Sequence, residues 1–408
     1  MDDLSLGSFS LAALAAILLS LLIRCALPAR SETSTRLPPG PWNLPIIGSL
    51  HHLVGSPPHR ALLSLARQHG PLMLLRLGEV PTVIGSSPEA AMEVMKTNDP
   101  VFASRPRGAM LDVVSFGGKG IILAPYGEHW RQMRKVCVVE LLSARQVRRM
   151  ERIRQSQLSH LTESIFIAAA SASPTIVVNL SQGFTELTNN VISRAVFGGK
   201  CQQQQEYLQE LSIVTMLVGG FSLDLLDVLL RLQEEDSLTF PLTMEIIGAI
   251  IYVNLGDLRY LRMVIKETLR LHPAVPLILR ASQENCKIMG YEIPKGTSVF
   301  VNTFAVASNP SYWDNAEVFE PERFENSTLD YNWAHFESVP FGAGRRQCPG
   351  ALFATMTIEL TLANLLYHFD WALPDGADPK ALDMGEVFGI TVRWRSNLCM
   401  LPALHLPH

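Results

Sequence analysis

The sequence lacks an excess of positive charge. Its 408 residues include 34 Lys and Arg against 38 Asp and Glu, which gives a formal net charge of −4. A dedicated nucleic-acid-binding protein would carry a strongly basic surface. We therefore expect no nucleic-acid partner.

Cysteine is also scarce, and its spacing excludes two classes of small scaffold. The six cysteines, at positions 25, 137, 201, 286, 348 and 399, form no C-x-x-C pair. That pattern is unlike a disulfide framework or a zinc ribbon. Because 48% of the residues are hydrophobic and 18% charged, the chain can bury a large core, and we expect a globular protein with mostly reduced thiols.

Residues 4–23 form a run of twenty positions without a charge. As a helix this run is roughly 30 Å long, the thickness of a bilayer core. We expect a signal-anchor transmembrane helix over residues 1–27. A cleaved signal peptide is the alternative, but Asp2 and Asp3 stand where such a peptide carries basic residues. Arg24, Arg30 and Arg36 follow the run, so the rest of the chain should stay cytosolic.

Prolines at positions 38, 39, 41 and 45 cannot continue a helix and favour stiff, extended backbone. We expect a proline-rich hinge over residues 28–45 and one domain over residues 46–408. Within it, apolar residues recur at helical spacing in segments 87–96, 127–142, 144–162, 179–197, 241–252, 257–271 and 351–368. Short β-branched runs indicate strands at 72–77, 82–84, 288–293 and 298–301. The expected class is mainly α with a minor β-sheet.

The most informative stretch is the glycine-rich window at residues 341–350, which leads into the apolar helix at 351–368. It places Cys348 at a helix start, where free N–H groups and the helix dipole favour a thiolate. A thiolate of this kind is a nucleophile or a soft metal ligand. Arg346 offers a fork for a carboxylate. Sulfur and arginine beside glycines fit haem, whose iron takes the sulfur and whose propionates take the arginine.

Other interpretations of this cysteine stay open at the level of the residues. It can be a buried cysteine in a glycine loop. A cysteine hydrolase is less favoured, because no histidine stands in a recognisable partner context.

Four ordered motifs resemble cytochrome P-450 enzymes of the plant microsomal type. They are the window at 341–350, an E-x-x-R helix at Glu267 and Arg270, a P-E-R-F loop at 321–324, and a W-x-x-x-R helix at Trp130 and Arg134. The resemblance implies the cytochrome P-450 fold and haem b as the cofactor.

The resemblance also implies roles for single residues. Cys348 would bind the iron, and the other haem-binding residues would be Phe341, Gly344, Gly350, Arg346, Trp130, Arg134 and Arg280. An exposed strand arginine is the alternative for Arg280. Glu267, Arg270 and Arg323 would form a buried network that anchors the haem loop. Losing one member would leave a buried charge unpaired.

Substrate would contact three apolar stretches by resemblance, with the candidate residues Val113, Phe116, Ala274, Val275, Leu277, Phe388 and Ile390. Apolar lining suits a lipophilic substrate, although such residues are also ordinary core. Five arginines lie between positions 145 and 154. They form either a solvated helix face or, with Arg131 and Lys135, a docking surface for an NADPH-cytochrome P-450 reductase.

The sequence departs from the family where the central distal helix should be. We find no A/G-G-x-D/E-T pattern, so the acid and threonine that help deliver protons to dioxygen are unidentified and the catalytic residues are unknown. Residues 241–252 resemble the start of that helix, whereas the residues from Val253 onward resemble the approach to the E-x-x-R helix. We call this junction, at which family segments are missing, a seam. A second seam lies at residues 221–224. The fold is therefore expected to be internally shortened.

Two functions follow from these observations. The first is a haem-thiolate monooxygenase, single-pass in the endoplasmic reticulum membrane and in contact with membrane lipid, that hydroxylates a small lipophilic substrate such as a terpenoid or another specialised metabolite. The alternative is a shortened, non-catalytic haem-binding protein or a poorly folded isoform of such an enzyme.

Overall fold

The structure is a computed structural model that describes residues 36–108, 111–112, 115, 117–170, 176–197, 258–329, 335–378, 382–389 and 391–405. The chain divides into two compact units. Unit 1 comprises residues 1–106 and 279–302, and unit 2 comprises residues 107–278 and 303–408. The expected domain over residues 46–408 therefore contains parts of both units.

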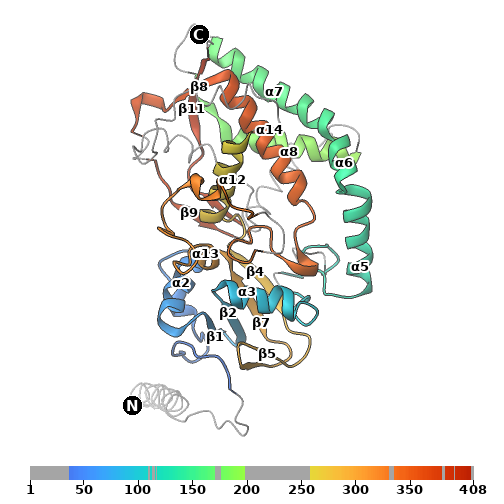
Figure 1. The fold of residues 1–408 in the computed structure, drawn as a ribbon, viewed down its shortest axis with the longest axis vertical. Coiled ribbons are helices and arrows are strands. Elements are labelled where there is room, and N and C mark those ends of the chain that lie inside the picture. Colours follow the sequence, from blue (N-terminus) through green and yellow to red (C-terminus); the bar gives the residue numbers. More distant parts are fainter. Residues whose placement is uncertain are drawn as a thin grey trace, which may run out of the picture. The chain divides into compact units, whose positions relative to one another are not determined.

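A four-stranded sheet is the centre of unit 1 (Figure 1). Its order is β1 (Leu72–Leu77), β2 (Val80–Gly85), β7 (Ser298–Asn302) and β4 (Leu277–Ala281). β1 and β2 form an antiparallel hairpin that pairs Leu77 with Val80. β2 and β7 run parallel although more than 200 residues separate them. A parallel pair needs a long crossover, which sequence patterns alone do not reveal.

Short helices and a second hairpin complete unit 1. They are η1 (Leu50–Leu53), α2 (Pro58–His69), α3 (Pro88–Met92), the π-helical η2 (Glu93–Thr97), β5 (Cys286–Ile288) and β6 (Tyr291–Ile293). Ser87 caps α3, because its hydroxyl accepts from the Ala90 N–H at 3.2 Å. The expected helix at 87–96 is confirmed, whereas α2 was not expected. The expected strand patch at 288–293 contains a turn at Met289 and Gly290, both with positive φ.

Unit 2 is mostly helical (Figure 1). Its helical segments are α5 (Glu128–Lys135), the π-helical η3 (Val136–Leu141), α6 (Ala144–Arg149), α7 (Glu151–Ala170), α8 (Leu180–Phe197), α12 (Arg259–Leu271), α13 (Thr303–Ala307), η4 (Pro321–Phe324), η5 (Gly344–Arg346), α14 (Ala351–His368) and η6 (Pro374–Gly376). The main core joins Ile165 of α7, Phe184 of α8, Val264 of α12 and Leu365 of α14, each at most 3% exposed. Burial of this apolar surface holds the four helices together.

Two small antiparallel sheets close unit 2. One has the order β3 (Val178–Asn179), β11 (Cys399–Leu404) and β8 (Phe369–Ala372), and the other pairs β9 (Glu386–Phe388) with β10 (Val392–Trp394). These C-terminal strands were not expected from the sequence. The main class, helical with minor sheets, is confirmed.

Several expectations fall outside the described residues. These are the anchor helix at 1–27, the first part of the hinge, the segment 241–252 and both seams. Within the described ranges, no helix combines the length and the apolar character that crossing a membrane requires.

Candidate functional site

The loop before α14 presents Cys348 by a series of tight turns in unit 2. Gly342 and Gly344 have φ of 68° and 69°, a left-handed conformation that glycine adopts without strain. The Cys348 N–H donates to the Phe341 carbonyl at 2.9 Å, and α14 begins three residues later. A Cβ placed on Gly350 would lie 3.9 Å from the Cys348 sulfur. The positive φ of the two glycines therefore lets the loop fold back on itself, and position 350 lies in van der Waals contact with the thiol.

Burial and local positive charge shift the pKa of the Cys348 thiol in opposite directions. Burial raises the pKa of Cys348, whereas the Gly350 N–H and the charge of Arg134 lower it. Burial has the larger effect, so the net pKa lies above the ordinary value. The sequence-based expectation of a depressed thiol pKa was wrong for the free side chain, because desolvation outweighs the helix start. A bound metal ion would supply the missing positive charge.

Trp130 of α5 lies against Arg346 of this loop. The Arg346 guanidinium stacks 4.2 Å from the ring centre of Trp130. Its two terminal nitrogens donate to the carbonyls of Ile121 at 3.3 Å and Ala124 at 2.5 Å. The Trp130 indole N–H also donates to the Ile121 carbonyl, at 3.0 Å. Both predicted propionate partners thus have neutral carbonyl acceptors in this structure, and their role toward a carboxylate stays a prediction.

Two further arginines of this region are partly or fully buried. Arg134, one helical turn after Trp130 on α5, is close enough to Cys348 for their charges to interact, and burial lowers the pKa of Arg134. Arg154 is 2% exposed, donates to the Val147 carbonyl at 2.9 Å and lies over the ring of Phe353. Arg154 therefore does not belong to a solvated face. The other four arginines between 145 and 154 are exposed.

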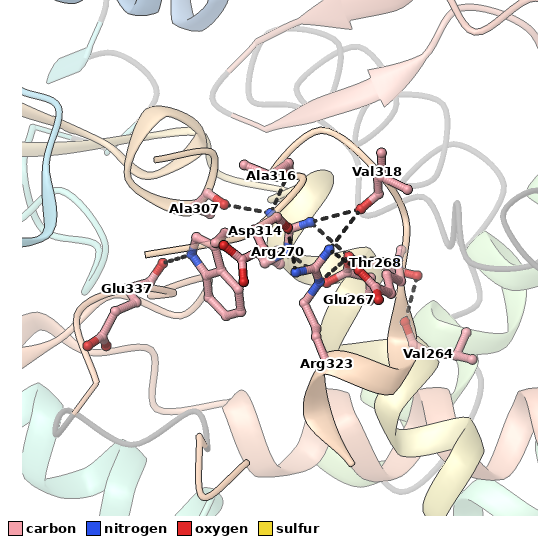
Figure 2. Close-up of polar contacts among 12 residues, drawn as sticks. Val264, Glu267, Thr268, Arg270, Ala307, Asp314, Ala316, Val318, Arg323 and Glu337 are labelled. Carbon is pink, nitrogen blue, oxygen red and sulfur yellow. Dashed lines mark hydrogen bonds and ion pairs between the residues drawn. The ribbon is translucent and has the colours of Figure 1, made fainter. Parts of the chain in front are cut away.

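Glu267, Arg270 and Arg323 meet in the interior of unit 2, and Figure 2 shows the three side chains turned toward one another. Glu267 and Arg270 share one face of α12, with the Arg270 Nε 2.7 Å and its Nη2 2.8 Å from the two carboxylate oxygens. Arg323, from η4, donates to the same carboxylate at 3.0 Å. The side chains of Glu267 and Arg270 are fully buried.

The remaining donors of this network bind backbone carbonyls. Arg270 donates to the carbonyls of Ala307 and Ala316 at 2.7 and 2.8 Å, and Arg323 donates to that of Asp314 at 2.9 Å (Figure 2). The network thereby ties α12 to α13, to η4 and to the irregular segment between them. A buried ion pair is stable only when its other donors are satisfied in this way. Its predicted role, anchoring the haem loop, stays a prediction.

Arg280 lies in unit 1 and is 1% exposed on β4, so the alternative of an exposed strand arginine was wrong. Beside it, the guanidinium of Arg105 donates to the Leu279 carbonyl, and burial lowers the pKa of Arg105 to about 10. Nothing in the sequence singled out Arg105, because its partner is distant in the chain. A role for Arg280 toward a propionate stays a prediction.

The substrate candidates are only partly described. Val113, Phe116 and Ile390 lie outside the described residues. The Ala274 carbonyl accepts from the Val392 N–H at 2.9 Å, and Val392 of β10 pairs with Phe388 of β9. The backbones of Ala274 and Phe388 are therefore connected through β10. The Val275 carbonyl accepts from the Thr303 hydroxyl, and Leu277 is buried at the start of β4. Contact of any of these residues with substrate stays a prediction.

Comparison with known proteins identifies the class. The sequence profile described as Cytochrome P450 matches residues 38–241 and 227–396. The chain is 38% identical to desmethyl-deoxy-podophyllotoxin synthase of Sinopodophyllum hexandrum, over 95% of this chain and 96% of that protein. It is 36% identical to dolabradiene monooxygenase of Zea mays, over 98% of both chains. The chain belongs to the cytochrome P450 family.

A solved structure supports the fold. A zebrafish cytochrome P450 with progesterone superposes with a TM-score of 0.70 at 23% identity, over 86% of this chain and all of that chain. Members of the family bind haem, iron protoporphyrin IX, and the family to which this chain belongs consists of oxidoreductases that incorporate oxygen from O2.

The same alignments show that the chain is internally short. The alignment to the Sinopodophyllum protein spans 492 positions, whereas this chain has 408 residues, so at least 84 positions of the relative have no counterpart here. The family profile matches in two segments that change over at residues 227–241. This interval lies between the two expected seams and between α8 and α12.

The side chains of unit 2 fit the haem that the family carries. Cys348 offers one sulfur ligand on a loop that places it three residues before the start of α14. Arg134 adds positive charge near that sulfur, and Arg346 presents a planar donor fork. A thiolate with cationic partners suits an iron porphyrin, because the sulfur is one of the ligands that haem iron takes and arginines pair with the two carboxylates.

Proposed function

We propose that this protein is a membrane-associated haem-thiolate monooxygenase that hydroxylates a small lipophilic substrate, with a terpenoid as the first candidate class. Bound haem would supply the activation of dioxygen. The observation that carries the proposal is the loop at 341–350, which holds Cys348 by the Phe341 carbonyl at the start of α14. The plant relatives named for oxidising dolabradiene, premnaspirodiene and germacrene A support the substrate class.

In this proposal the residues of the chain have separate tasks. Cys348 would bind the iron through its sulfur. Arg134, Arg346, Trp130 and Arg280 would bind the carboxylates of the porphyrin and orient it. The network of Glu267, Arg270 and Arg323 would hold the loop in place from behind. Electrons would come from an NADPH-cytochrome P-450 reductase that docks on the exposed arginines between 145 and 152, with the catalytic domain cytosolic at the endoplasmic reticulum.

The spectrum of the reduced, carbon-monoxide-bound protein tests the proposal directly. We expect a Soret band strongly shifted to the red in the full chain and its loss in Cys348→Ser. A matched control is Cys286→Ser on β5, which should leave the band unchanged. The proposal fails if Cys348→Ser retains the shifted band, or if the full chain takes up no haem.

A second function is favoured by the missing positions. A chain that lacks at least 84 positions of a relative, together with the acid and threonine pattern, can bind haem through the described loop and still lack turnover. Incubation with reductase, NADPH and a panel of terpenoid hydrocarbons separates the two. Oxygenated product supports the monooxygenase. A normal haem band without product supports the non-catalytic haem-binding form, and no band at all supports the poorly folded form.

A further inference from the structure

Three side chains of α7 and α8 have nitrogen donors that are buried without an acceptor. Arg154 and Gln157 of α7 are 2% and 3% exposed, and Arg194 of α8 is half-buried. Within the described part of the chain, the Nε of both arginines and the Nε2 of Gln157 are buried and have no hydrogen-bond partner. Folded proteins pair nearly all such groups, so these three exceptions point to a bound water or ion.

The packing of α7 against α8 gives the relative direction of the two helices. The main core of unit 2 contains Ile165 of α7 and Phe184, from the first half of α8. A smaller cluster contains Leu158 of α7 with Leu187 and Val191, from the second half of α8. Moving toward the start of α7 therefore means moving toward the end of α8, so the two helices run antiparallel. Figure 1 shows them packed together with α14.

This direction brings the three polar side chains to the same end of the helix pair. Arg154 lies one helical turn before Leu158, and Arg194 lies one turn after Val191. Gln157 is three residues after Arg154 and so shares its face of α7. The two arginines and the glutamine therefore form one cluster, which we call the 154–194 cluster.

The positive charges of the cluster are poorly compensated. Arg154 donates to the Val147 carbonyl at 2.9 Å, and its guanidinium lies 5.8 Å from the ring centre of Phe353 on α14. Arg194 has no hydrogen-bond or ion-pair partner among the described residues. A buried guanidinium without a counter-ion is costly, because a low dielectric strengthens the electrostatic penalty.

Glu151 is the acid that acts on this cluster. Its charge raises the pKa of Arg154, but burial has the larger effect and lowers that pKa. The Glu151 carboxylate also accepts a hydrogen bond from Gln155 at 3.4 Å, on the neighbouring turn of α7. Glu151 therefore compensates Arg154 only in part, and the hydrogen bonds of its carboxylate do not extend to the cluster.

The nature of the donors indicates which ligand would complete the cluster. A water molecule could accept N–H bonds but would leave two guanidinium charges without a counter-ion. A carboxylate supplies one negative charge, whereas a phosphate group carries about −1.5 to −2 near neutral pH and offers several acceptor oxygens. Arginine forks bind phosphate oxygens with charge-assisted hydrogen bonds. Two arginines and one amide donor therefore suit a phosphate group best.

We propose that the 154–194 cluster binds one phosphate group between α7 and α8, close to Phe353 of α14. The bound group would take the place of the missing counter-ion and would tie the two helices to each other. The ligand chemistry is that of inorganic phosphate or of a small phosphomonoester. The inference does not depend on the proposed haem-thiolate function, because neither haem nor turnover enters it.

Titration of inorganic phosphate into the full chain in detergent tests the proposal by calorimetry. The ionic strength is held constant with sodium chloride, because exposed arginines attract any anion. We expect a single saturable site and a rise of the thermal unfolding midpoint by several degrees, since a ligand of the folded state stabilises it. Sulfate should replace phosphate, and acetate should bind more weakly. Glycerol phosphate is titrated in parallel, and tighter binding than that of inorganic phosphate would assign the site to phosphomonoesters.

Gln157→Glu is the most specific variant, because it changes the amide to a carboxylate of the same shape. The new carboxylate would neutralise Arg154 and Arg194 from within the chain. We expect the unfolding midpoint without phosphate to rise, and the phosphate titration to show no binding. A merely structural glutamine would give the opposite result, a lower midpoint with phosphate binding retained.

Arg194→Gln removes one charge from the half-buried side of the cluster, where folding is least at risk. We expect phosphate to bind at least about tenfold more weakly, which corresponds to one hydrogen bond to a charged group. The matched control is Arg152→Gln, which removes the same charge from an exposed position on α7 and should leave the dissociation constant unchanged. Far-ultraviolet circular dichroism checks that each variant is folded.

Three results would overturn the proposal. The wild type can show no saturable phosphate binding, which would mean that water fills the cluster. Arg152→Gln can weaken binding as much as Arg194→Gln, which would mean that the anion is held by the surface charge of α7. Gln157→Glu can retain full phosphate binding, which would place the anion elsewhere on the chain.

Discussion

Two groups of guanidinium donors in unit 2 are largely buried, and they bind different kinds of acceptor. Arg270 and Arg323 share the carboxylate of Glu267 at distances of 2.7 to 3.0 Å. Arg346 instead stacks on Trp130 and donates to the neutral carbonyls of Ile121 and Ala124. Glu267 is thus the counter-ion of the first group, whereas the contacts described for Arg346 are an aromatic ring and two backbone carbonyls.

The difference separates a structural role from a binding role. Separating a guanidinium from a buried carboxylate costs free energy, because the carboxylate is left unpaired in a low dielectric. A guanidinium on carbonyls can exchange them for an anion and gain a charge-assisted hydrogen bond. Glu267, Arg270 and Arg323 thus suit the support of the fold, whereas Arg346 suits the carboxylates of a bound haem.

The largest effect is expected from Glu267→Gln, which would break the first group. Two buried guanidinium groups would lose their counter-ion, and we expect the free energy of unfolding to fall by about 3–5 kcal/mol. Urea unfolding followed by far-ultraviolet circular dichroism measures this loss. Glu320→Gln is the control, because Glu320 is half-exposed at the edge of the network and its pair with Arg323 is worth at most about 1 kcal/mol. Equal effects of the two variants would contradict the distinction.

A smaller effect, confined to haem, is expected from Arg346→Lys. Lysine keeps the charge but loses the planar fork and the stack on Trp130, at a loss of about 1.5–3 kcal/mol for a hydrogen bond to a charged group. We expect haem transfer to an excess of apomyoglobin to speed up about 10- to 100-fold, with little change in the unfolding midpoint. Arg345→Lys, at the neighbouring exposed position, should leave the transfer rate unchanged. A parallel fall in stability would instead make Arg346 a structural residue.

The smallest effect is expected from Trp130→Phe. The phenyl ring retains a surface for Arg346 but removes the N–H that donates to the Ile121 carbonyl at 3.0 Å. One neutral hydrogen bond contributes about 0.5–1.5 kcal/mol, so haem transfer should accelerate about 2- to 10-fold. Trp394→Phe, at a buried indole on β10, serves as the control. No change in Trp130→Phe would show that the indole N–H is dispensable.

Much of the local structure could be predicted from the sequence. The apolar spacing at 351–368 predicted α14 at the bounds that the structure has. The i,i+3 spacing of Glu267 and Arg270 also placed both on one helix face, as the structure shows. These features depend on residues a few positions apart, so a single stretch of sequence contains the information.

The contacts that complete the site could not be predicted in this way. Arg323 reaches Glu267 across 56 positions, and Arg346 reaches Ile121 across 225. The resemblance to a family supplied the first pairing, but no spacing in the chain indicated that Trp130 and Arg346 stack. Arg154 looked like its exposed neighbours in sequence, and only its contact with Phe353 shows that it is buried.

The sequence by itself thus determined the long helices of unit 2, the cysteine that is proposed to bind the iron, and the resemblance to the family. The tertiary structure decided which arginines pair with a carboxylate and which donate to backbone carbonyls. The physical reason is the range of the interactions. Helical periodicity is set by hydrogen bonds four residues apart, whereas burial and charge pairing depend on segments that meet only when the chain has folded.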